Sequence, residues 1–177
     1  MTAKEQEKAA RQFAEYWDDK GDEKSETQRF WIQLLGEVLG IEKPTDYIEF
    51  EKRVALTHTS FIDAYIPETK VLIEQKSADI DLHKSYKQSD GVVLSPYQQA
   101  KRYADEMPNS IRPDWIVVCN FKEFLIYNLE KPHDEPVQLL LENLAKDSYC
   151  LSFLASQKTK EIKREEELSV EAGRIVG

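Results

Sequence analysis

Two apolar runs, FIDAYI at residues 61–66 and VLIEQK at residues 71–76, constrain the fold of this chain more than any other feature. Both runs have the composition of β-strands, and the short polar segment between them favours a hairpin. Three charged residues interrupt the runs, namely Asp63, Glu74 and Lys76. The sequence therefore raises the question of what these charges do in a hairpin with the character of a core.

The expected hairpin loop is centred between Glu68 and Thr69. A regular ladder about that centre places Asp63 directly opposite Glu74. Because side chains on a strand alternate between its faces, Lys76 points to the same face as Glu74. A bulge would change this register, so the prediction applies to a regular ladder.

The two facing carboxylates repel each other unless something compensates their charge. Their neighbours on both faces of the strands are largely apolar, so we expect a sheet that is covered on both sides, where unpaired charges are costly. A Mg²⁺ ion compensates directly, because it takes oxygen ligands and typically uses one or two carboxylates. A lysine beside it can position a water and stabilise negative charge on phosphorus. The alternative is a solvated strand face with an ordinary cluster of ion pairs.

The composition indicates a globular protein of one domain. The chain has 177 residues, of which 41% are hydrophobic and 32% are charged. Its net charge of -9 gives it no general attraction for nucleic acid. Cys119 and Cys150 are predicted to be buried, reduced thiols. Because neither a signal peptide nor an apolar run of membrane length occurs, we expect a cytoplasmic protein without membrane contact.

Hydrophobic periodicity predicts helices and strands along the chain. A first helix ends near Asp19, and a second one starts at Ser25, which forms a capping-box pattern with Gln28, and stops near Gly40. Ser95 is the predicted N-cap of a later helix. The order of these elements indicates an α/β fold with a mixed sheet flanked by helices. The expected strands begin near residue 47 and include FIDAYI, VLIEQK, DWIVVCN and EFLIYNL. Segment 78–91 is expected to form a short helix followed by a loop, and segment 135–146 a helix.

Two short motifs resemble those of nucleases. Asp63, ten intervening residues and then Glu74-Gln75-Lys76 resemble the PD-(D/E)xK signature. Gln99 and Tyr103, at i and i+4 on one helix face, are similar to the Q-x-x-x-Y element of RecB-type nucleases. The wider sequence, from about residue 13 to about residue 154, resembles the N-terminal region of the MmeI-like restriction-modification enzymes. The segments that carry this resemblance are GDEKSETQRFW, YIEFEKRV, HTSFIDAYIPETKVLIEQKS, SDGVVLSPYQQAKRYADEMP and VVCNFKEFLIYNLEKPHDEPV.

The resemblance implies a restriction-endonuclease-like fold with an N-terminal helical segment. Asp63 and Glu74 would be its metal ligands, and Lys76 would position the attacking water. Nucleases of this fold often add an acid from the preceding helix, for which Glu26 is our choice and Glu37 and Glu51 are alternatives.

The later helix and its surroundings supply further candidates. In the resemblance, Gln99 and Tyr103 lie beside the site and help to hold the lysine or the DNA; a helix surface with Tyr103 partly in the core is an equal alternative. Four cations could contact DNA phosphates or simply belong to solvated helix faces, namely Lys84, Lys87, Lys101 and Arg102.

The resemblance also implies boundaries and partners. Residues 1–155 would form the nuclease domain with its N-terminal helices, and residues 156–177 would begin a helical connector. The connector would lead to an adenine methyltransferase that uses S-adenosylmethionine and to a target-recognition domain, neither of which this sequence contains.

The charge pattern of the hairpin favours a Mg²⁺ site that also accepts Mn²⁺, and the resemblance implies an endonuclease that hydrolyses phosphodiester bonds of double-stranded DNA. Two other functions stay open. One is a non-catalytic DNA-binding or docking module on the same scaffold, and the other is a protein-interaction domain without a DNA role.

Overall fold

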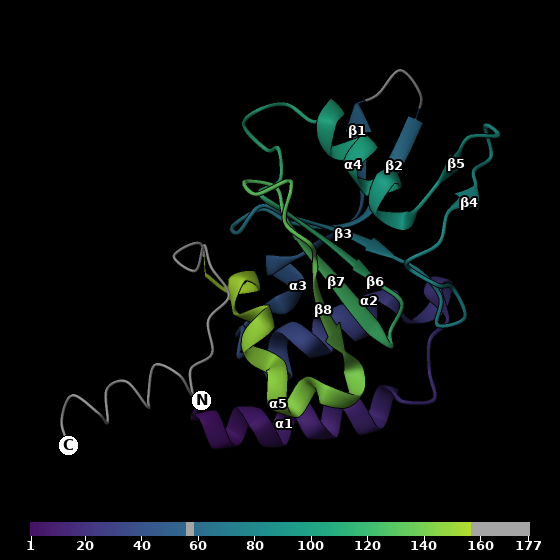
Figure 1. Cartoon of the computed structure of the whole chain (residues 1–177). Helices are drawn as coiled ribbons and strands as arrows, with labels where there is room; N and C mark the ends of the chain where they lie inside the picture. The colour runs from purple at the N-terminus through teal and green to yellow at the C-terminus, as the bar shows by residue number, and fades with distance from the viewer. Residues whose placement is uncertain (56–58, 157–177) are drawn as a thin grey trace.

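The computed structural model describes residues 1–55 and 59–156 and is built around a six-stranded mixed sheet (Figure 1). The strand order is β1-β2-β3-β6-β7-β8; β3 and β6 run parallel, and every other pair of neighbours runs antiparallel. A separate pair, β4 and β5, forms a small arm. The strands are β1 (Glu49–Ala55), β2 (Thr59–Ile66), β3 (Val71–Gln75), β4 (Tyr86–Lys87), β5 (Val93–Leu94), β6 (Trp115–Cys119), β7 (Glu123–Asn128) and β8 (Val137–Leu140).

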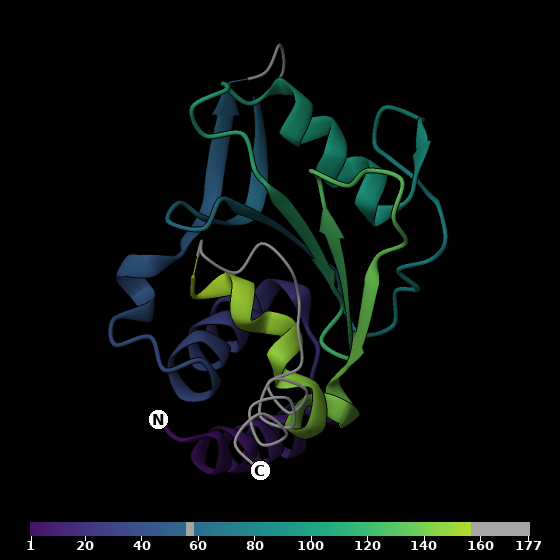
Figure 2. The ribbon, with the colours of Figure 1, turned by 60° about the vertical axis from the view of Figure 1, so that its left-hand side comes forward.

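Helices cover both faces of the sheet, as Figure 2 shows. α4 lies over one face, and α1, α2 and α5 pack against the other. This arrangement confirms the predicted mixed sheet flanked by helices, with an N-terminal helical segment. The helical elements are α1 (Ala3–Trp17), α2 (Glu23–Gln33), a π-helical continuation (Leu34–Val38), α3 (Pro44–Tyr47), α4 (Pro96–Glu106), a 3₁₀ turn (Leu141–Asn143), α5 (Leu144–Asp147) and a 3₁₀ segment (Ser148–Leu154).

Each face of the sheet has its own hydrophobic core. On the larger side, α1 and α2 contribute aromatic rings in contact, and the ring centroids of Trp17 and Phe30 are 5.2 Å apart. On the smaller side, Ala100 and Ala104 present the small face of α4 to the sheet. Because β3 and β6 lie between the two cores, they are buried along their whole length. The hairpin strand β3 is therefore covered on both sides, as predicted.

The predicted start of the second helix is wrong. α2 begins at Glu23, and its N-cap is Asp22, whose Oδ1 accepts hydrogen bonds from the backbone N–H groups of Lys24 and Ser25. Both residue types can cap a helix. Asp22 lies three residues earlier in the chain than Ser25, and its side chain accepts from the unpaired N–H groups at the helix start, so the helix begins after Asp22. The other predicted cap is confirmed, since the Ser95 side chain accepts from the N–H of the third helical residue of α4.

Two further predictions of helix are also wrong. Segment 135–146 begins as the edge strand β8, in which Leu139 pairs with Phe124 of β7, and becomes helical only afterwards. Segment 78–91 contains turns and strand β4 rather than a short helix. In segment 135–146, pairing with β7 overrides the local helical periodicity, whereas β4 pairs with β5 only a few residues further along the chain.

The end of the described chain is tied to the β2–β3 turn. The carbonyl oxygen of Leu154 accepts hydrogen bonds from the Tyr47 hydroxyl at 2.6 Å and from the Thr69 hydroxyl at 3.3 Å. The expected connector, residues 156–177, lies outside the described residues except for its first position. Cys119 and Cys150 are buried, and neither is in a disulfide within the described residues. No helix in the described part of the chain is long and apolar enough to cross a membrane.

Candidate active site on the β2–β3 hairpin

The predicted register of the hairpin is confirmed next to the turn, but the pairing changes at Asp63. There the carboxylate of Asp63 accepts a hydrogen bond of 2.7 Å from the backbone N–H of Gln75. The side chain thus takes the role of a ladder partner at the position where the prediction set Asp63 against Glu74. The regular pairs are Ala64 with Ile73, Tyr65 with Leu72, and Ile66 with Val71.

The neighbouring strand β1 is irregular at the same point. Its ladder with β2 omits Glu51 and Asp63, although the flanking pairs Phe50–Ala64 and Lys52–Ile62 keep one register. Glu51 has a φ of 51°, in the left-handed region that residues with a side chain rarely adopt. Asp63 is therefore free of regular pairing on both sides, which leaves its carboxylate available to Gln75.

Glu74 and Lys76 form a close pair on the face of the sheet that α4 covers. Glu74 is 3% exposed, and its Oε1 lies 3.1 Å from the ammonium nitrogen of Lys76. The same ammonium donates a hydrogen bond of 3.0 Å to the side-chain oxygen of Gln99 on α4. Because 20% of the Lys76 side chain is exposed, the ammonium stands between a buried acid and the surface.

Burial dominates the acid–base chemistry of the two acids. It raises the pKa of Asp63 to about 6 and the pKa of Glu74 to about 8. The hydrogen bond from Gln75 opposes the rise at Asp63, whereas the charge of Asp63 adds to the rise at Glu74. Burial lowers the pKa of Lys76, but the charge of Glu74 and the hydrogen bond to it outweigh burial, so the pKa is raised. The two acids thus share one lysine, Lys76, which stays protonated at neutral pH.

A third acid, Glu23, acts on the site from the start of α2. Burial has the largest effect on the pKa values of Asp63, Glu74 and Lys76, and the negative charge of Glu23 makes a smaller contribution that raises all three. Glu23 is not among the acids predicted from the sequence, because the predicted helix starts at Ser25. The signal was present, since an aspartate directly before Glu23 is a preferred N-cap residue.

The acids considered from the sequence have different surroundings. Glu26 accepts a hydrogen bond of 3.1 Å from the backbone N–H of Gly21, in the loop before its own helix. Glu37 is exposed in the π-helical continuation of α2. At Asp63, burial has the largest effect on the pKa, and the charge of Glu51 contributes a smaller rise.

The loop before α2 lies against the chain just beyond Lys76. The carbonyl of Gly21 accepts from the N–H of Ala78 at 3.0 Å, and the Ser77 hydroxyl accepts from the N–H of Glu23 at 3.3 Å. A Cβ on Gly21 would lie 2.4 Å from the Cβ of Ala78, so this approach requires glycine. An open hollow of about 530 Å³ occupies this junction, lined by Gly21, Asp22, Glu23, Lys24, Ser77 and Asp79.

The residues proposed to contact DNA lie on α4 and in the segment before it. Tyr103 is half-buried and packs against the smaller core. Lys87 is exposed on β4. The other three cations form ion pairs at the surface: Lys84 with Asp81, Lys101 with Asp105, and Arg102 with Asp90.

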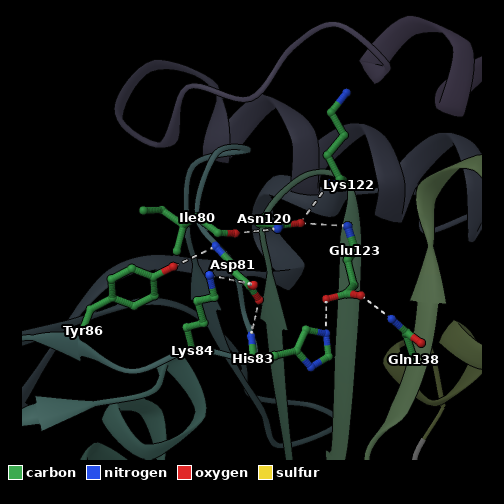
Figure 3. A network of polar contacts seen from close by, with 9 residues as sticks. All are labelled: Ile80, Asp81, His83, Lys84, Tyr86, Asn120, Lys122, Glu123 and Gln138. Carbon is green, nitrogen blue, oxygen red and sulfur yellow. Dashed lines mark hydrogen bonds and ion pairs between the residues drawn. The ribbon is translucent and has the colours of Figure 1, made fainter.

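The segment between Lys76 and the arm is held by the turn between β6 and β7 (Figure 3). Asn120 donates through Nδ2 to the Ile80 carbonyl at 2.8 Å, and its Oδ1 accepts from the N–H groups of Lys122 and Glu123. A second contact joins Nε2 of His83 to Oε1 of Glu123 at 2.9 Å. The chain that leaves the candidate site is therefore fixed to the end of the sheet.

The acids suit one kind of metal better than others. Within residues 1–55 and 59–156, no group of three or more histidine, cysteine, aspartate or glutamate side chains is placed to hold a metal ion. Asp63 and Glu74 offer two carboxylates, and burial raises the pKa values of both despite the opposing charge of Lys76. Two oxygen ligands fit Mg²⁺, which keeps waters and binds substrate phosphate, and do not make a closed zinc site.

The six-stranded mixed sheet between helical layers defines a restriction-endonuclease-like α/β domain. Residues 8–177 match the family described as MmeI, N-terminal domain, and the chain belongs to this family. Membership places the chain in the context of restriction-modification enzymes. Neither a curated protein nor a solved structure matches the chain significantly.

Proposed function

We propose that this chain is a Mg²⁺-dependent endonuclease domain that hydrolyses phosphodiester bonds of double-stranded DNA, as the cleavage part of a fused restriction-modification enzyme. One observation carries the proposal. The Lys76 ammonium lies 3.1 Å from the buried Glu74 and 3.0 Å from Gln99, and the partly buried Asp63 on the adjacent strand acts on its pKa. A buried acid and a partly buried acid with one partly exposed lysine are costly for packing alone, whereas phosphodiester hydrolysis uses all three groups.

The acids supply oxygen ligands for the ion. Asp63 and Glu74 would hold Mg²⁺, which when bound activates water and neutralises phosphate charge. Holding a cation also offsets the cost of placing the buried carboxylate of Glu74 and the partly buried carboxylate of Asp63 within reach of each other's charge. Glu23 at the start of α2 adds negative charge on the same side and favours the cation further.

The lysine acts on the water and the phosphate. Its raised pKa keeps Lys76 positive at neutral pH. The ammonium orients the attacking water and stabilises negative charge on the phosphate oxygens as the new P–O bond forms. The attacking water releases one proton to solvent, the bond from phosphorus to the leaving sugar oxygen breaks, and that oxygen takes a proton from solvent. Gln99 keeps the ammonium at the edge of the site, where it can reach the phosphate.

The remaining parts of the proposed enzyme lie outside this chain. We assign sequence recognition to a target-recognition domain and methylation to an S-adenosylmethionine-dependent adenine methyltransferase of the same polypeptide. The net charge of -9 supports this division, because so acidic a domain needs another module to bring it to DNA.

Substitution of the lysine tests the function in the natural full-length enzyme. We expect Lys76→Ala to reduce single-turnover DNA cleavage by at least about 100-fold, as loss of a group that stabilises transition-state charge does. DNA affinity and methylation should stay at the wild-type level, which shows that the enzyme is folded. Lys8→Ala on α1 is the control with the same change of charge. Cleavage that survives Lys76→Ala would overturn the proposal.

A second candidate is a non-catalytic docking module. The ion pairs of Lys84, Lys101 and Arg102 favour it, because they leave fewer cations available for phosphates. In that case neither Lys76→Ala nor removal of Mg²⁺ would change any activity that depends on this chain.

A further inference from the structure

Gln75, between Glu74 and Lys76 in the chain, is a fully buried polar residue that the proposed chemistry does not use. Its side chain points toward α2, away from the two charges. Its Oε1 accepts a hydrogen bond of 2.8 Å from the indole N–H of Trp31, and its Nε2 donates one of 3.1 Å to the carbonyl of Lys76. A buried amide is stable only when its polar atoms are paired in this way.

The hydrogen bond from the Gln75 side chain gives the carbonyl of Lys76 a partner that the sheet does not supply. The parallel ladder between β3 and β6 ends at the pair Gln75–Cys119. The N–H of Lys76 still donates to the Cys119 carbonyl at 2.7 Å, but the carbonyl of Lys76 lies beyond the ladder and accepts from Gln75. The main chain of Lys76 is therefore held from both sides, once by the sheet and once by this glutamine.

The same residue also contacts the other strand of the hairpin. Its backbone N–H donates to the Asp63 carboxylate at 2.7 Å. Gln75 thus joins three parts of the site: Asp63 through its main chain, Lys76 through its Nε2, and α2 through Trp31. Because the contact with Asp63 is a main-chain one, substitution of the side chain leaves it in place.

We propose that Gln75 is a positioning residue for Lys76, anchored by Trp31. By fixing the main chain at Lys76, it sets the place from which the ammonium reaches Glu74, Gln99 and the phosphate. This inference rests on the proposed nuclease function. Rotation of the unsupported Lys76 peptide would displace the ammonium, and a displacement of about 1 Å can reduce a rate by about 100-fold.

Two variants of the natural full-length enzyme separate positioning from stability. Gln75→Met removes the amide but leaves the Trp31 N–H buried without a partner, so it lowers both the melting temperature and the cleavage rate. The double variant Trp31→Phe/Gln75→Met removes both polar partners and regains part of the melting temperature. The single-turnover cleavage rate of the double variant should stay at least about 10-fold below that of the wild type. Its KM for DNA should change less than about twofold. If the rate returns to wild type together with stability, Gln75 has only a structural role.

The core contains a matched control. Trp17 donates through Nε1 to the side-chain oxygen of Gln33 at 3.0 Å, away from the site. Trp17→Phe should lower the melting temperature without changing kcat. Trp31→Phe alone, which keeps the amide but loses its anchor, should lower kcat at constant KM even if the double variant does not fold. A wild-type kcat in Trp31→Phe would contradict the inference.

Lys76→Ala separates failure of this inference from failure of the proposed nuclease function. Cleavage by Lys76→Ala at the wild-type rate would overturn the nuclease assignment itself. An inactive Lys76→Ala together with a fully active Trp31→Phe/Gln75→Met would overturn only the positioning role of Gln75.

Discussion

At the scale of single residues, burial decides what Asp63, Glu74 and Lys76 can do. Carboxylates on an open strand would titrate near their ordinary pKa values, whereas here burial raises the pKa of Asp63 to about 6 and that of Glu74 to about 8. The lysine between Glu74 and Gln99 keeps its charge. Folding therefore tends to protonate the acids, and a bound cation tends to ionise them.

The raised pKa values make stability depend on pH. Between the ordinary pKa of a carboxyl group and the raised value, the folded chain holds protons that the unfolded chain releases, so the free energy of unfolding falls as pH rises from about 4 to about 8. Glu74→Gln should remove the part of this decline above pH 6. Denaturant titrations at pH 5, 6.5 and 8 without divalent ions measure it. The exposed Glu142→Gln is the control, and equal slopes for wild type and Glu74→Gln would contradict the prediction.

Binding of a divalent cation should become stronger as pH rises, because the same two carboxyl groups lose their protons. Mn²⁺ should raise the melting temperature more at pH 8 than at pH 6, because protons compete for the carboxylates at lower pH. A metal concentration of about 100 times Kd adds about 2.7 kcal/mol to the free energy of unfolding. Asp63→Asn/Glu74→Gln should abolish the shift in a thermal melt. An unchanged shift in this double variant would place the cation elsewhere.

At the scale of elements, the start of α2 and the path of β8 show how local signals compete. Asp22 and Ser25 are both N-cap residue types, and only Asp22 is used. β8 lies at the edge of the sheet, where Leu139 is buried against β7 despite its place in a helix-like pattern. Glu23 lies beside the site because the loop before α2 packs against the chain just beyond Lys76, through Ser77 and Ala78.

Substitution of each residue tests the cap. Asp22→Ala should lower the free energy of unfolding by about 1 kcal/mol, because two N–H groups at the start of α2 lose their acceptor. Ser25→Ala should change it by no more than about 0.5 kcal/mol, as an exposed substitution inside a helix does. Urea denaturation of both variants measures the difference. A larger loss for Ser25→Ala would restore the helix start predicted from the sequence.

At the scale of the whole molecule, charge limits how the domain meets DNA. The net charge is -9, and three of the four cations proposed to contact phosphates are engaged by acids of the same chain. Association with DNA must either exchange these ion pairs for phosphate contacts or depend on other domains.

Release of one cation tests this exchange. Asp105→Asn frees Lys101 on α4, and it should strengthen DNA binding and steepen its dependence on log salt by about 1. Glu7→Gln frees Arg11 on α1, on the other side of the sheet, and makes the same change of net charge. Fluorescence anisotropy at several salt concentrations measures both variants. Equal effects would indicate a general response to net charge rather than a contact at α4.

The sequence by itself determined the features that depend on neighbours along the chain. Alternation and a short loop specified the hairpin register next to its turn, from Ile66–Val71 to Ala64–Ile73, and local cap chemistry specified Ser95 at the start of α4. The continuous apolar run of β6 specified a strand covered on both faces. Each of these follows from steric and hydrogen-bond preferences within a few residues.

Only the tertiary structure decided the contacts between segments that are distant in sequence. These include the bond from Gln75 to the Asp63 carboxylate, the Trp31–Gln75 pair and the approach of Glu23 to the site. The edge strand β8 belongs with them, because its partner β7 is a separate segment. Such contacts depend on how helices and strands pack across the sheet, so no local pattern contains them. The sequence thus identified the charges of the site, and the packing of α2 and α4 against β3 decided how they are held.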